Sequence, residues 1–356
     1  MPPTRLFIPG PTEVRSDVLR QLIRPMIGHR SAEFSRLFQR LQPRLQRLFQ
    51  TQDRVYISTS SGTGLWEAAV RNCVRTRCLN LVNGAFGERW RRVTLANGKQ
   101  SLALEAEWGR AIRAEQVEEV LEHECVDAVT LVHSETSTGV LNPLEEIAKV
   151  VHRFPDVLFL VDAVSSLGGV DIPVEDLGID VCLTSSQKAL ALPPGFSLAS
   201  VSDRALERAQ EVENRGYYFD FLVFEEYLAR NQTPTTPPVS LLYALDYQLD
   251  RILGEGLRAR FRRHQALAQM VRNWAEERGF GLFAEEGYRS PTLTVVRNGR
   301  GIDIQALQAY LLGRGMAIAD GYGPLKGKTF RIAHMGDVTA AMVEKVLLAV
   351  DEFLSW

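Results

Sequence analysis

Residues 157–201 read VLFLVDAVSSLGGVDIPVEDLGIDVCLTSSQKALALPPGFSLASV, and they carry the clearest indication of fold class in the chain. Three apolar runs begin within it, at 157–162, 181–186 and 196–202. Runs of this length that are apolar on both faces are typical of strands in a sheet that helices cover on both sides. The stretch therefore predicts neighbouring buried strands at the centre of an α/β sheet.

The same alternation of strands and helices extends toward the N-terminus. Further apolar runs lie at 54–59, 79–84 and 126–133, and amphipathic helical stretches lie at 63–76, 87–97, 114–123 and 143–153. Strands that alternate with helices in this way predict a mostly parallel sheet.

The rest of the chain changes character after residue 202. Residues 203–275 have a helical period, interrupted at 231–240 by a proline-rich stretch that predicts a fixed loop. The tail predicts a small α+β domain, with strand-like stretches at 291–296 and 329–334 and helical stretches at 303–314 and 337–354.

Composition excludes several classes of protein. The 356 residues are 45% hydrophobic, enough for one large and one smaller core, and the net charge of −2 argues against a nucleic-acid partner. The N-terminus lacks a signal-peptide pattern, and no run of about 18 apolar residues could span a membrane. The four cysteines lack the spacing of a metal site, which predicts free thiols in a reducing compartment, the cytoplasm.

Asp162 and Lys188 follow successive strands of the predicted sheet. A carboxylate at the end of an apolar strand is costly unless it meets a cation, and the ring nitrogen of pyridoxal 5′-phosphate (PLP) would supply one. Apolar residues around Lys188 favour a lysine with a lowered pKa and a nucleophilic amine. Taken alone, Asp162 also fits a helix N-cap, and Lys188 fits a lysine that reaches solvent from the core edge. The pair favours a PLP site.

Three further segments offer groups for such a site. Ser61, Gly62 and Thr63 lead from a strand into a helix, where free N–H groups bind anions such as a phosphate. Phe86 lies in a glycine-flanked turn after a strand, where its ring fits the face of a pyridine, and Thr136 follows another strand end. The alternatives are a serine-capped helix, a core contact and ordinary turn chemistry.

Together these segments resemble the class V aminotransferases, of the alanine–glyoxylate and serine–glyoxylate aminotransferase type. The resemblance runs from FIPGPTEV (7–14) to FRIAHMG (330–336), and its strongest pieces are ETSTG, VDAVSSLGG, SQKALALPPG and TPTTPPVS. It implies fold type I of the PLP enzymes, with a seven-stranded sheet, and a homodimer with shared active sites. We expect an N-terminal segment at 1–16 near the active site, a large PLP-binding domain at 17–255 and a small domain at 256–356.

The resemblance also implies roles for individual residues. Lys188 would bond the cofactor covalently, and Asp162 would hold the pyridinium nitrogen. Val164 and Phe86 would lie against opposite ring faces, and Thr136 would bond the ring hydroxyl. The residues implied for the phosphate are Ser61, Gly62, Thr63, Gln187 and, from the other subunit, Thr236.

Arg331 in FRIAHMG resembles the arginine that grips the substrate α-carboxylate, although taken alone it fits a strand residue facing solvent. Phe86, Thr63 and Thr233 depart from the animal alanine–glyoxylate enzymes, which have tryptophan, histidine and tyrosine there. These changes preserve stacking and phosphate donors, so they bear on the substrate and leave cofactor binding intact.

The implied reaction is ping-pong transfer of an amino group from a small donor, serine or alanine, to glyoxylate or pyruvate. An acidic donor, aspartate or phosphoserine, needs a second cation, for which the sequence offers His29, Arg30, Lys326 and Lys328. Of these, Arg30 is the substrate-binding candidate, and the two lysines are more typical of solvated charges. Two rival functions are a cysteine desulfurase and an inactive partner subunit on the same fold. A desulfurase needs a nucleophilic cysteine on a loop near the substrate, and this chain has no cysteine after Cys182.

Overall fold

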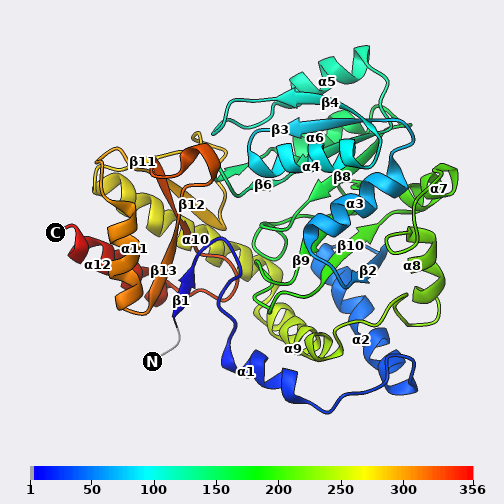
Figure 1. The fold of residues 1–356 in the computed structure, drawn as a ribbon, viewed down its shortest axis with the longest axis horizontal. Coiled ribbons are helices and arrows are strands. Elements are labelled where there is room, and N and C mark those ends of the chain that lie inside the picture. The colour runs from blue at the N-terminus through cyan, green and yellow to red at the C-terminus, as the bar shows by residue number, and fades with distance from the viewer. Residues whose placement is uncertain (1–3, 356) are drawn as a thin grey trace.

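The computed structural model describes residues 4–355, which form two sheets with their covering helices (Figure 1). The larger sheet has seven strands in the order β2-β10-β9-β8-β5-β3-β4. Their bounds are β2 (Arg54–Ser58), β3 (Arg77–Val82), β4 (Gln100–Glu105), β5 (Ala128–Val132), β8 (Leu158–Asp162), β9 (Val181–Ser185) and β10 (Ser197–Val201). Only β10 runs antiparallel to its neighbours, so the prediction of a mostly parallel α/β sheet is confirmed.

Alternate residues of each strand feed two hydrophobic cores, one on each face of this sheet. On β8, Phe159 and Val161 belong to one core, whereas Leu158 and Leu160 belong to the other. The first core is closed by α2 (Ala32–Phe49), α5 (Ala114–His123), α6 (Leu144–Val151) and α9 (Val239–Glu255). The second is closed by α3 (Gly62–Cys73), α4 (Ala85–Ala96), α7 (Asp203–Glu211) and α8 (Phe221–Leu228). Burial on both faces explains why these strands are continuously apolar.

The smaller sheet has five strands in the order β1-β13-β14-β12-β11. Its strands are β1 (Arg5–Phe7), β11 (Gly281–Leu282), β12 (Leu293–Arg297), β13 (Met316–Asp320) and β14 (Thr329–Ala333). Its helices are α10 (Leu257–Glu277), α11 (Ile304–Gly313) and α12 (Ala340–Phe353), which share a separate hydrophobic core with it. Because β1 pairs with β13, the N-terminal strand belongs to this smaller sheet (Figure 1).

Short elements complete the chain and lie near the predicted site or the N-terminus. They are α1 (Ser16–Leu19), η1 (Arg20–Ile23), the hairpin of β6 (Ser134–Glu135) and β7 (Val140–Leu141), and η2 (Gly323–Leu325). Among residues 4–355, no helix is both long enough and apolar enough to cross a membrane.

A single glycine separates the helix that ends the larger unit from the helix that begins the smaller one. Gly256, between α9 and α10, has a φ of 83°, a conformation that side-chain-bearing residues rarely adopt. The separate sheets and this break support our proposed division at 17–255 and 256–356, with the segment 1–16 joined to the smaller sheet.

A buried arginine connects the two units close to Lys188. Arg260 on α10 is 1% exposed and donates to the carbonyl oxygens of Gly168, at 2.8 Å, and Ala189, at 2.9 Å. Its other terminal nitrogen meets Asp337 at 3.1 Å. A buried cation that bridges three segments fixes the position of the turn that carries Lys188.

Candidate active site

A cavity of about 210 Å³ lies at the carboxyl ends of β8 and β9, where ligands bind in open α/β sheets. It is lined by most of the residues predicted for the cofactor, namely Ser61, Gly62, Thr63, Phe86, Thr136, Asp162, Val164, Gln187 and Lys188. Trp66, Arg89, Val132, Ser134, Ser165 and Ser185 also line it. Residues from five separated parts of the sequence therefore meet in one place.

Asp162 ends β8 as a buried carboxylate without an ion pair among residues 4–355. The backbone N–H of Val164 donates to its Oδ1 at 2.6 Å, and Trp66 Nε1 donates to its Oδ2 at 2.9 Å. Burial raises the pKa of Asp162 to about 7, although these two donors and the charge of Lys188 act to lower it. Turns, not a helix, follow at residues 163–169, so the alternative of a helix N-cap is wrong.

Lys188 lies in the turn after β9, and its Nζ donates to the carbonyl oxygen of Pro9. Desolvation lowers the pKa of Lys188 to about 8; Asp162 opposes this shift, and the positive charge of Arg331 adds to it. A Cβ on Gly10 would lie 2.6 Å from Lys188 Cδ, and the φ of 104° at Gly10 is one that side-chain-bearing residues rarely adopt, so glycine here brings the backbone close to the lysine. Thr12 completes the contact by donating through Oγ1 to the Lys188 carbonyl at 3.0 Å. The N-terminal segment thus crosses directly over the lysine.

The start of α3 presents free donors to the cavity. Ser61 occupies the N-cap position but makes no side-chain capping bond, so its hydroxyl is left for a ligand. A Cβ on Gly62 would lie 2.8 Å from Val164 Cγ2, which shows how closely the backbone approaches the cavity wall. Ser185 Oγ is buried at the same cavity and has no hydrogen-bond partner within the described residues 4–355. Backbone N–H groups, the helix dipole and unused hydroxyls suit an anion such as a phosphate.

Phe86 and Thr136 lie on the far wall of the cavity, and one buried carboxylate holds both segments. Glu135 Oε2 accepts from the backbone N–H groups of Phe86 and Gly87, each at 3.1 Å. Thr136 Oγ1 shares a hydrogen bond of 2.7 Å with Ser165 Oγ. The aromatic ring and the hydroxyl are therefore fixed before any ligand binds.

Arg331, in the middle of β14, is 9% exposed, so its predicted alternative as a solvent-facing strand residue is wrong. Its Nε donates to the carbonyl of Asp320 at 2.9 Å, and its Nη1 approaches the carbonyl of Thr136 at 3.5 Å. Burial lowers the pKa of Arg331, with Tyr322 and Asp320 opposing the shift. It has no carboxylate partner among residues 4–355, which leaves a cation beside the cavity for an acidic ligand.

Two predicted residues lie outside the cavity of the same protomer. The carbonyl of Thr236 is 3.5 Å from Thr59 Oγ1, so Thr236 lies close to the start of α3 without lining the cavity. Arg30 donates to the carbonyls of Thr233, at 2.6 Å, and Pro234, at 3.0 Å. Because its donors hold this loop, Arg30 lies outside the cavity of its own protomer, and its role as a substrate contact stays a prediction.

The other candidate cations also lie elsewhere. His29 Nε2 is 3.5 Å from Thr236 Oγ1, and Lys326 and Lys328 are exposed, as expected of solvated charges.

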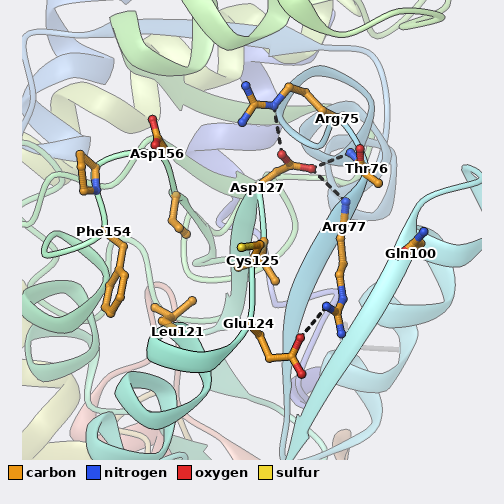
Figure 2. Close-up of a pocket in the computed structure, with 13 residues that line it drawn as sticks. Arg75, Thr76, Arg77, Gln100, Leu121, Glu124, Cys125, Asp127, Phe154 and Asp156 are labelled. Carbon is orange, nitrogen blue, oxygen red and sulfur yellow. Dashed lines mark hydrogen bonds and ion pairs between the residues drawn. The ribbon is translucent and has the colours of Figure 1, made fainter.

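A larger cavity, of about 610 Å³, lies at the opposite ends of the strands (Figure 2). Its arginines already have partners: Arg75 meets Asp127 at 3.0 Å, and Arg77 meets Glu124 at 2.7 Å. Since these charges neutralise each other and the amino ends of parallel strands rarely hold ligands, the smaller cavity is the candidate site.

Residues 16–325 match the family described as aminotransferase class V. The chain belongs to the class V aminotransferase family. It is 40% identical to an uncharacterized aminotransferase of Methanocaldococcus jannaschii, over 93% of this chain and 87% of that protein. It is 35% identical to the L-aspartate–glyoxylate aminotransferase of Paracoccus denitrificans, over 95% and 87%. The crystal structure of an alanine–glyoxylate aminotransferase from Nostoc sp. matches with a TM-score of 0.94 at 32% identity, covering 99% of this chain and 96% of that one.

This aminotransferase is thus a PLP-dependent transaminase of fold type I, as the resemblance implied. Sequence reasoning missed six of the residues that line this cavity, namely Trp66, Arg89, Val132, Ser134, Ser165 and Ser185. Trp66 and Ser185 lie in the interior of α3 and at the end of β9, where nothing in the sequence marks them as ligand groups. Arg89 had a signal, because it follows Phe86 by three residues and so shares its helix face.

Proposed function

We propose that this aminotransferase moves an amino group from an amino acid to a short 2-oxo acid, glyoxylate or pyruvate, with PLP bound to Lys188. The observation that carries the proposal is the shared cavity of Asp162 and Lys188, a buried carboxylate without a cation and a lysine with a lowered pKa. Relatives named for glyoxylate as acceptor support the choice of a short acceptor.

The residues of the cavity fit PLP at each of its polar groups. Asp162 would keep the ring nitrogen protonated, and Thr136 would bond the ring hydroxyl. Phe86 and Val164 would enclose the ring, and Arg331 would hold the substrate α-carboxylate. The phosphate would bind Ser61, Gly62, Thr63 and Gln187, with Ser185 of this protomer and Thr236 of a second protomer completing its donors.

Bound PLP supplies a protonated ring that accepts the electron pair released at the substrate Cα. Lys188 then carries the proton. With a pKa of about 8, its Nζ is unprotonated in a useful fraction near neutral pH, so it can take the proton from the substrate Cα and would deliver it to the C4′ carbon of the bound cofactor. Arg331 and Phe86 orient the substrate so that the Cα–H bond points at Nζ.

Two rival functions have less support. A desulfurase needs a reactive cysteine near the substrate, but none of Cys73, Cys78, Cys125 and Cys182 lines the cavity. An inactive subunit would not require a desolvated lysine, Lys188, in the same cavity as the buried carboxylate of Asp162. We also propose that the enzyme is cytoplasmic; its free cysteines support this location, since thiols persist in a reducing compartment.

The first prediction tests the lysine. Lys188→Ala should remove the visible absorption of the bound cofactor and reduce turnover at least about 1,000-fold, since both the covalent link and the proton carrier are lost. The melting temperature of the cofactor-free protein should stay within a few degrees of the wild type. Lys149→Ala, which removes an exposed lysine paired with Glu145, is the matched control and should behave as the wild type. Comparable transamination by Lys188→Ala would overturn the assignment.

A further inference from the structure

Arg89 is the one arginine among the residues that line the candidate cavity. It lies one turn after Phe86 on α4, and its guanidinium is 5.1 Å from the centre of the Phe86 ring. Its neighbours Arg91 and Arg92 both pair with Glu88, at 3.3 and 3.1 Å. Arg89 has no carboxylate partner among residues 4–355. It is therefore a half-buried cation that no group of the described protomer neutralises.

Tyr322 links Arg89 to the proposed carboxylate-binding arginine. Arg89 Nη2 donates to Tyr322 Oη at 2.5 Å, and the Arg331 guanidinium lies 5.6 Å from the centre of the same ring. Tyr322 also contacts Phe86, with ring centres 5.5 Å apart. Two arginines thus flank one tyrosine, and one of them, Arg89, lines the candidate cavity.

The charge of the donor decides whether both arginines are used. Serine or alanine brings one carboxylate, which Arg331 would bind. Arg89 would then keep only the neutral hydroxyl of Tyr322 as its acceptor. A partly buried cation is stabilised far more by a charged acceptor, and a guanidinium binds a carboxylate or phosphate with two parallel hydrogen bonds.

We propose that Arg89 binds a second, distal acidic group of the amino donor, so that this enzyme takes an acidic amino acid in preference to serine or alanine. The inference rests on the proposed function and replaces the small donor expected from the sequence. The donors that fit this proposal all carry a distal anion. The experiment below distinguishes donors with a distal carboxylate from those with a distal phosphate. Binding of the cofactor phosphate by Arg89 has less support, because the start of α3 already presents unused donors.

The donor half-reaction tests the inference. kcat/KM is measured for aspartate, glutamate, phosphoserine, alanine and serine in the wild type, Arg89→Gln and Arg89→Lys. We expect the wild type to prefer one of the three acidic donors. Arg89→Gln should lower kcat/KM for that donor about 10- to 100-fold, the range of a lost charge-assisted contact, and alter alanine less than about threefold. Arg89→Lys should lose less than Arg89→Gln, because lysine keeps the positive charge but cannot donate two parallel hydrogen bonds.

The controls separate binding from structure. Arg92→Gln removes an exposed arginine of the same helix and should leave all five donors unchanged. Tyr322→Phe keeps the ring beside Phe86 but removes the hydroxyl that holds Arg89, and should reduce the acidic donor alone.

A binding measurement avoids turnover altogether. Succinate and propionate are titrated into the cofactor-loaded enzyme, and dissociation constants are read from the visible spectrum. Succinate should bind more tightly than propionate to the wild type, and Arg89→Gln should remove this advantage.

Three outcomes would overturn the inference. An equal loss for all five donors in Arg89→Gln would make Arg89 a structural link to Tyr322, and a weaker dissociation constant for PLP with an unchanged donor ratio would assign it to the phosphate. In both cases the proposed function would stand. A wild type that is inactive with every donor would instead overturn the proposed function, and this inference with it.

Discussion

Asp162 and Lys188 are each unfavourable in the protein without its cofactor, and the same property makes them useful to it. The pKa of Asp162 rises because burial penalises its charge, and the pKa of Lys188 falls for the same reason. A protonated ring nitrogen would offset the cost of burying the Asp162 charge, and a covalent bond to the amine would remove the cost of burying the Lys188 charge. Cofactor binding should therefore stabilise the fold by more than its contact area suggests.

The second prediction follows from these two pKa values in the cofactor-free protein. The folded pKa of Asp162, about 7, exceeds its ordinary value of 3.8, so the folded state binds the proton more tightly. The free energy of unfolding should fall as pH rises from about 4 to about 7, and Asp162→Asn should flatten this fall. The pKa of Lys188 is lowered from 10.5 to about 8, so here the unfolded state binds the proton more tightly. The free energy of unfolding should therefore rise as pH increases from about 8 to 10.5.

Urea unfolding of the cofactor-free wild type, Asp162→Asn and Lys188→Ala across pH 4 to 10.5 measures both slopes. Asp162→Asn should also retain PLP less well, because a neutral amide cannot hold the pyridinium. An unchanged slope together with unchanged cofactor retention would show that Asp162 serves only the turn at Val164.

At the scale of elements, the start of α4 depends on Glu135. This carboxylate is fully buried and accepts from the backbone N–H groups of Phe86, Gly87 and Ser137 and from the Ser137 hydroxyl. The side chain occupies the space that a Cβ on Gly84 would need, at 2.4 Å. Glu135 therefore positions Phe86 from outside the candidate cavity.

The third prediction concerns Glu135→Gln. The amide nitrogen cannot accept hydrogen bonds, so at least one donor at the start of α4 loses its partner, at a cost of about 1–3 kcal/mol in the free energy of unfolding. The dissociation constant for PLP should also rise, because Phe86 is no longer fixed. Glu88→Gln, on the surface of the same helix, should cost less than about 0.5 kcal/mol. Equal stability of the two variants in urea would contradict the role of Glu135.

The pattern of burial explains which elements the sequence predicted. Strands buried on both faces, such as β8 and β9, were read from their apolar runs, and the helix predicted at 114–123 is α5. Strand β4, at the edge of the sheet, has no fully buried residue and was missed, as was β13, which is only partly buried. The pairing of β1 with β13 could not be predicted either, because it joins segments about 300 residues apart.

Within the site, the order of the motifs was enough to predict which residues at strand ends meet, because the carboxyl ends of parallel strands lie at one edge of the sheet. It did not place groups whose surroundings depend on tertiary contacts. Arg30 follows an apolar turn, as a pocket residue can, yet the fold directs it to the loop at Thr233.

At the scale of the whole molecule, one exposed apolar region stands out near the loop that carries Thr236. Ile23 is 85% exposed and Met26 is 67% exposed. Their segment is fixed beside α9 and this loop, because Tyr243 Oη donates to the Pro25 carbonyl at 3.2 Å and Arg30 holds Thr233. Exposed apolar side chains beside a predicted shared site support the symmetric homodimer that we propose.

The last prediction is that the active enzyme is a dimer held in part by these side chains. Burial of each should contribute about 1.5–3 kcal/mol, so Ile23→Glu with Met26→Glu should weaken association on the order of 100-fold or more. Sedimentation at micromolar concentration should then show monomers, and PLP affinity and turnover should fall together because Thr236 no longer reaches the partner's phosphate site. Leu312→Glu, at a 59% exposed position on α11, is the control and should remain dimeric. A wild type that sediments as a monomer with full activity would rule out a shared site, since each protomer would then bind the phosphate with its own α3 donors alone.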